Sequence, residues 1–153
     1  MRRLHFWIGL AGVVAFLLTG QYMDRWLGHL AGVADLPRML YRSAHIYLLL
    51  GSLLNLVLGL YQVEAGDGWR RWAGRAGSIL IAIAPVLFLI AFAREPLRPN
   101  FNRPFAAPGI YACAVGAVML ALSRAGLKGI PKGAPYDGTR KGVSHERDDV
   151  ETR

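Results

Sequence analysis

The polar side chains most suited to chemistry fall inside an otherwise apolar stretch, residues 37–63. Polar and small positions recur there in two interleaved series with a spacing of seven: Arg38, His45, Ser52 and Gly59, and Tyr41, Leu48, Asn55 and Gln62. Residues at i, i+3, i+4 and i+7 share one face of a helix, so both series lie on the same side. Since unpaired polar groups are costly in hydrocarbon, we expect this face to turn toward other helices or a cavity.

Three basic residues at the start of this stretch form a candidate contact for anions or lipid headgroups. Arg38, Arg42 and His45 lie at i, i+4 and i+7. Positive charge near a helix N-terminus opposes the helix macrodipole, which points to a bound lipid phosphate, carboxylate ligand or acidic partner. The alternative is that both arginines extend to ordinary headgroups, with Asp24 or Asp35 nearby.

Deeper in the same helix, Ser52, Asn55 and Gln62 form a candidate intramembrane polar stripe. The simplest interpretation is hydrogen bonding between helices, which is worth about 1 kcal/mol for each bond. The alternative is that the stripe lines a small channel or carrier built by oligomerisation.

The histidines raise the possibility of haem or metal binding. Four-helix b-type cytochromes are similar to this chain in architecture, but they place paired histidines at similar depth on facing helices. We expect His5 and His45 near opposite sides of the membrane, and His29 in a loop. A redox protein that uses His45 is therefore an alternative hypothesis, and we expect no cofactor.

Other catalytic or metal-binding patterns are weak in this sequence. No Cys/His set has zinc spacing, and no Ser/His/Asp set is evident. The acidic residues, Glu95 among them, fall in loops or the tail, which argues against a proton-coupled exchanger. We predict no catalytic residue and no metal ligand, which makes an enzyme the less favoured class. Cys113, the single cysteine, falls in an apolar run and is expected to be inert packing.

Composition and apolar run length predict an all-α integral membrane protein. The chain of 153 residues is 54% hydrophobic. Runs of membrane-spanning length predict an up-and-down four-helix bundle within residues 1–123, with spans at about 4–20, 43–63, 76–93 and 105–123. The polar segment 124–153 is expected to be a disordered tail. The net charge of +8 comes from basic residues that flank the apolar runs, so it indicates membrane topology rather than nucleic-acid binding.

The segments between spans carry their own expectations. Residues 21–36 and 64–75 are predicted loops, and 94–104 is predicted to be a Pro-rich turn. Pro85 lies inside the third span, where we expect a kink and a backbone carbonyl without its helical partner. The first run could instead be a signal peptide, although bulky Leu18 disfavours cleavage.

The distribution of Lys and Arg predicts the orientation. These residues are more numerous in the N-terminus, the 64–75 segment and the tail than on the other side of the expected bundle. By the positive-inside rule, both termini are cytoplasmic. Simple loops and compactness favour a multi-pass protein of a bacterial inner membrane.

Taken together, these patterns predict a small non-enzymatic membrane protein. It would act as an accessory, assembly or interaction subunit through the polar face of residues 37–63. Its expected partners are the lipid bilayer and other membrane subunits or a second copy.

Overall fold

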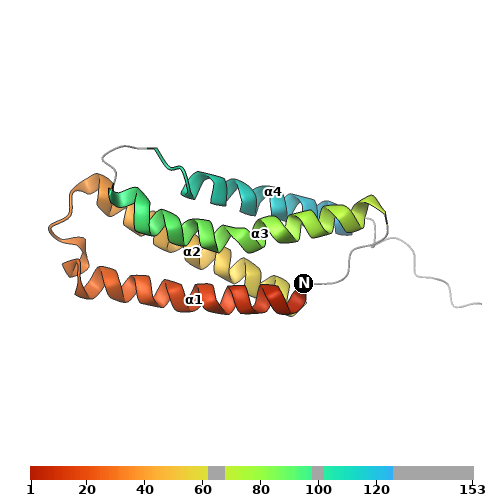
Figure 1. The fold of residues 1–153 in the computed structure, drawn as a ribbon, viewed down its shortest axis with the longest axis horizontal. Helices are drawn as coiled ribbons and strands as arrows, with labels where there is room; N and C mark the ends of the chain where they lie inside the picture. Colours follow the sequence, from red (N-terminus) through yellow and green to blue (C-terminus); the bar gives the residue numbers. More distant parts are fainter. Residues whose placement is uncertain (62–67, 98–101, 126–153) are drawn as a thin grey trace, which may run out of the picture.

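In the computed structural model, the described part of the chain is all-helical, as predicted. The structure describes residues 1–61, 68–97 and 102–125, in which no strand occurs. The long helices are α1 (Arg2–Arg25), α2 (Asp35–Tyr61), α3 (Trp69–Arg94) and α4 (Ala106–Arg124). Two short 3-10 helices, η1 (Gly28–Leu30) and η2 (Glu95–Leu97), follow α1 and α3 (Figure 1). Gln62 and nearly all of the predicted tail lie outside the described residues.

All four long helices are long and apolar enough to cross a membrane. They extend beyond the expected spans, so the expectation of loops over 21–36 and 64–75 is partly wrong. The helix α1 continues to Arg25, and α3 already begins at Trp69. The reason is that hydropathy marks the extent of the apolar sequence, whereas helical hydrogen bonding continues into polar sequence. Arg70, partly exposed, and Arg71, exposed, both lie in α3.

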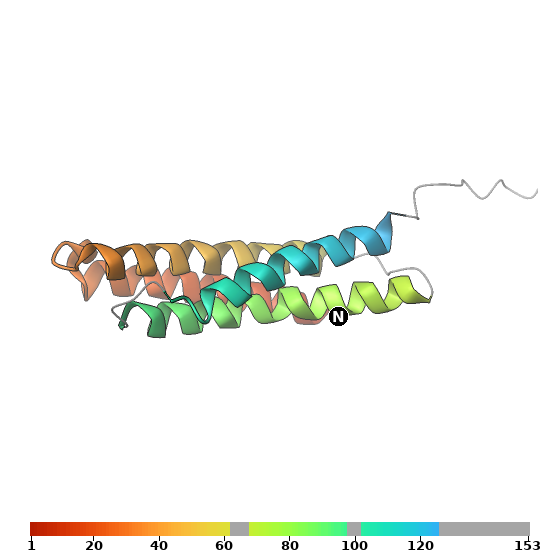
Figure 2. The same ribbon diagram turned by 90° about the horizontal axis from the view of Figure 1, so that it is seen from above.

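The helices α2 and α3 lie between α1 and α4. The main packing pairs are α1 with α2, α3 with α4, and α2 with α3, and Figures 1 and 2 both show the long helices side by side. Close contacts set the direction within each pair. Gly59 lies against Phe6 while Gly20 lies against His45, so α1 and α2 run antiparallel. The helices α3 and α4 are also antiparallel, because Gly77 lies against Gly116 while Phe88 lies against Gly109.

The core is small and lies along the faces that α2 and α3 turn to each other. One buried apolar cluster contains Ala44, Ala91, Phe92 and Ala106, and the other contains Leu48, Ala84, Phe88 and Cys113. The opposite face of α2 is exposed, with Ile46, Leu50, Leu53, Val57 and Leu60 each about half accessible. The apolar side chains of this fold therefore face outward as well as inward.

Close backbone approach makes glycine necessary on the seam between α1 and α2. A Cβ at Gly59 would lie 2.6 Å from the backbone N and Cα of Phe6, which no change of rotamer can relieve. Replacing glycine inside a helix gains about 1 kcal/mol of helix propensity. Overpacking against backbone costs about 1–3 kcal/mol and outweighs that gain.

We therefore expect Gly59→Ala to lower the thermal unfolding midpoint of the protein purified in detergent. Gly32→Ala is the matched control, because a Cβ there meets nothing within 4 Å. Circular dichroism during heating measures both variants. If Gly59→Ala melts at or above the wild-type temperature, the close approach of α1 and α2 is contradicted.

Candidate functional site

A buried group of polar side chains joins α1, α2 and α3, and we name it the His5 cluster: His5, Asn55 and Ser78. The Nδ1 atom of His5 lies 2.7 Å from Oδ1 of Asn55, and its Nε2 atom lies 3.0 Å from Oγ of Ser78. All three side chains are essentially inaccessible to solvent. Each of the three helices thus contributes one polar group to a shared, enclosed network.

Asn55 is the centre of this network because of a proline in the neighbouring helix. Pro85 has no N–H, so the carbonyl of Ile81, four residues earlier, loses its helical donor. Nδ2 of Asn55 donates to that carbonyl at 2.8 Å and also to the carbonyl of Gly51 at 2.8 Å. The freed carbonyl predicted from the sequence is therefore satisfied by a side chain from α2.

These contacts assign the orientation of the Asn55 amide and one ring hydrogen of His5. Two carbonyl oxygens face one terminal atom of Asn55, so that atom is the amide nitrogen and the other is Oδ1. His5 must then carry a hydrogen on Nδ1 and donate it to Oδ1. The second ring nitrogen, Nε2, faces the hydroxyl of Ser78.

The polar stripe predicted on α2 is buried where the structure describes it. Ser52 and Asn55 are fully enclosed, and Ser52 donates to the carbonyl of Leu48 in its own helix. Gln62 lies outside the described residues. Sequence reasoning missed His5, although it shares a face of α1 with Gly12 and Thr19 at a spacing of seven.

The three basic residues proposed to contact an anion do not form one group. Arg38 and Arg42 line a shallow groove on α2, where Nη1 of Arg38 lies 3.5 Å from Asp35 and Nη2 donates to the carbonyl of Val33 at 2.7 Å. His45 faces α1 instead. The two arginines stay a candidate contact for headgroups, and His45 belongs to the helix interface.

His45 packs against α1 through a hydrogen bond and a stacked ring. Its Nδ1 atom lies 2.9 Å from Oγ1 of Thr19, whose own hydrogen goes to the carbonyl of Phe16. His45 therefore donates from Nδ1. Its ring stacks on Phe16 with centroids 4.0 Å apart. His29 points elsewhere, to Asp24 at 2.8 Å, so the structure does not bring His29 and His45 together.

A second buried polar group lies at the start of α4, around Glu95, which the sequence places in the Pro-rich turn 94–104. Glu95 is 1% exposed and follows directly after α3. Its Oε1 atom accepts hydrogen bonds from the backbone N–H groups of Phe105 at 3.0 Å and Ala106 at 2.8 Å. The physical reason is that the first N–H groups of a helix have no internal partner and favour negative charge.

Arg103 links this carboxylate to α2. Its Nε atom lies 3.4 Å from Oε2 of Glu95, and Nη2 donates to Oγ of Ser43 at 2.6 Å. The guanidinium also lies over the ring of Tyr47, 5.5 Å from the centroid. Together these contacts tie the ends of α3 and α4 to α2.

Comparison with known proteins finds no matching family model, no matching curated protein and no matching solved structure. Within the described part of the chain, no group of three or more His, Cys, Asp or Glu side chains could hold a metal ion. The arrangement of the two buried polar groups is one that orients helices.

The pairing of Asn55 with the carbonyl freed by Pro85 can be tested with a double-mutant cycle. We expect Asn55→Leu to destabilise the protein by about 1–3 kcal/mol, because it leaves buried groups unpaired. Pro85→Ala restores an N–H to α3, so it should reduce the cost of Asn55→Leu by about 1 kcal/mol. Thermal or denaturant unfolding in detergent gives the four stabilities.

The control combines Pro85→Ala with Ser123→Ala, whose side chain donates to the carbonyl of Leu120 in its own helix. That pair should be additive. If the changes in unfolding free energy caused by Asn55→Leu and Pro85→Ala are also additive, Asn55 does not hold the Ile81 carbonyl.

Proposed function

We propose that this chain is an integral membrane protein with four up-and-down spans and both termini in the cytoplasm, in the inner membrane of a bacterium. Four helices of spanning length and the exposed apolar face of α2 support this arrangement. The exposed apolar side chains would face acyl chains, while Ser52 and Asn55 of α2 are enclosed. The distribution of Lys and Arg along the chain supports the orientation.

Labelling from outside the cell tests the orientation. In a Cys113→Ala background, we expect Gly32→Cys, between η1 and α2, to react with a membrane-impermeant maleimide added to intact cells. Arg3→Cys, at the start of α1, should react only after the cells are opened. The reverse pattern would invert the topology, and labelling of both positions in intact cells would contradict the single crossing by α1 that the proposal places between them.

We further propose that the protein is a non-enzymatic accessory or assembly subunit whose shape depends on the polar face of α2. The observation that carries this proposal is the complete use of Asn55, which binds His5, Gly51 and Ile81 within the chain. A polar stripe occupied in this way supports a rigid scaffold rather than a lining for ions. Its outer surface would then contact other membrane subunits or a second copy.

Purification in mild detergent followed by mass spectrometry tests the accessory role. We expect another membrane polypeptide to remain bound in a fixed ratio, and we expect Asn55→Leu to release it because the helices shift. Ser123→Ala, a buried change within α4 that leaves the His5 cluster intact, is the control that should retain it. A uniform homo-oligomer that conducts ions in vesicles would instead favour the channel alternative.

A further inference from the structure

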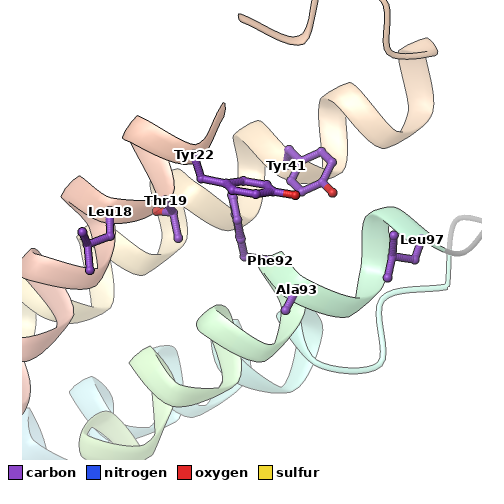
Figure 3. A pocket seen from close by; sticks show the side chains of 7 residues that line it. All are labelled: Leu18, Thr19, Tyr22, Tyr41, Phe92, Ala93 and Leu97. Carbon is purple, nitrogen blue, oxygen red and sulfur yellow. The ribbon is translucent and has the colours of Figure 1, made fainter. Parts of the chain in front are cut away.

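A cleft opens between the ends of α1 and α3, with α2 at its base. Its volume is about 350 Å³. Residues from these three helices and from η2 line it: Leu18, Thr19, Tyr22, Tyr41, Phe92, Ala93 and Leu97. Figure 3 shows Tyr22 from α1 and Tyr41 from α2 close together above Phe92 of α3. We name it the aromatic cleft.

The described lining of the aromatic cleft is uncharged, and it combines three aromatic rings and three aliphatic side chains with three hydroxyls, those of Thr19, Tyr22 and Tyr41. Phe92 meets Tyr22 and Tyr41 edge to face, with centroids 6.3 Å and 5.1 Å away. The hydroxyl of Thr19 is already used by Phe16 and His45. The two phenol hydroxyls are therefore the groups that can bind a ligand, and they suit a flat, neutral head that bears acceptor oxygens.

A second cleft continues along the same faces of α1 and α3. It has a volume of about 180 Å³, its lining is almost wholly apolar, and it is formed by Ile8, Ala11, Gly12, Ala15, Leu48, Pro85, Val86 and Leu89. We name it the apolar cleft.

The two clefts line up because their residues follow helical spacing. On α1 the lining runs from Ile8 to Tyr22 in steps of three or four. On α3 it runs from Pro85 to Ala93 in the same way and continues to Leu97 of η2. From α2, Tyr41 lines the aromatic cleft and Leu48, seven residues later, lines the apolar cleft. From Ile8 to Tyr22 the groove is roughly 20 Å long.

We propose that this groove binds one membrane lipid with a neutral, ring-shaped head and a single long apolar tail, the chemistry of an isoprenoid quinone. The head lies between Tyr22, Tyr41 and Phe92, and the tail lies in the apolar cleft. A phospholipid fits less well, since the described lining of the aromatic cleft offers its phosphate no cation. The proposal concerns binding alone, and it rests on the proposed location in a membrane.

The head contact is tested with purified protein and a ubiquinone analogue, using quenching of intrinsic fluorescence to measure Kd. We expect Tyr22→Phe and Tyr41→Phe each to weaken binding about three- to tenfold, which is the loss of one hydrogen bond. Tyr61→Phe removes an exposed hydroxyl elsewhere on α2 and should leave Kd unchanged. Unchanged Kd in both cleft variants would overturn the assignment of the head.

The tail contact is tested by filling the apolar cleft. Ala11→Leu places a larger side chain at an exposed position that lines it, so it should weaken a long-tailed analogue and spare a short-tailed one. Ala117→Leu, exposed on α4, is the matched control. Equal affinity of Ala11→Leu and wild type for the long-tailed analogue would overturn the assignment of the tail.

Fractionation separates failure of this inference from failure of the proposed function. The proposal of a ring-headed lipid is contradicted alone if the protein stays in alkali-washed membranes, binds neither analogue and retains only phospholipid after extraction. Protein released by the alkaline wash contradicts both.

Discussion

The carbonyl of Ile81 is the constraint on which the arrangement of these helices depends. Pro85 removes its normal donor in the middle of an apolar helix, where water is absent if the helix crosses a bilayer. A side chain from another helix must then supply the hydrogen bond, and Asn55 does so. This single requirement fixes both the rotation of α2 and its height relative to α3.

The position of α1 follows from the same requirement. Once Nδ2 of Asn55 is used by two carbonyls, its Oδ1 atom needs a donor, and His5 provides one while also reaching Ser78 of α3. Glycines let the backbone of α1 approach α2 closely along the rest of its length. Since α1 is drawn toward α2, its contacts with α3 are few, and a long groove is left between α1 and α3.

Periodicity in the sequence predicted the helical class and the inward orientation of Ser52 and Asn55, because burial on one face leaves a spacing of three, four and seven residues. The freed carbonyl near Pro85 was also predictable, since it follows from the chemistry of proline. Its partner was not, because no rule of spacing relates residues on different helices. The expected depth of His5 relative to His45 does not indicate a site, whereas the face of α1 that it shares with Gly12 and Thr19 does.

Glu95 shows a different limit of sequence reasoning. A carboxylate next to proline and arginine is typical of a solvated turn, yet this one is buried against the first N–H groups of α4. The burial of Glu95 depends on the start of α4 folding back against the end of α3, and the composition of the segment does not encode that contact. The polar groups of four residues hold helices together: Glu95, Arg103, His5 and Asn55. The phenol hydroxyls of the aromatic cleft are among the polar groups that stay able to bind another molecule. Function is therefore more reasonably sought on the surface and in the groove than in the buried polar stripe.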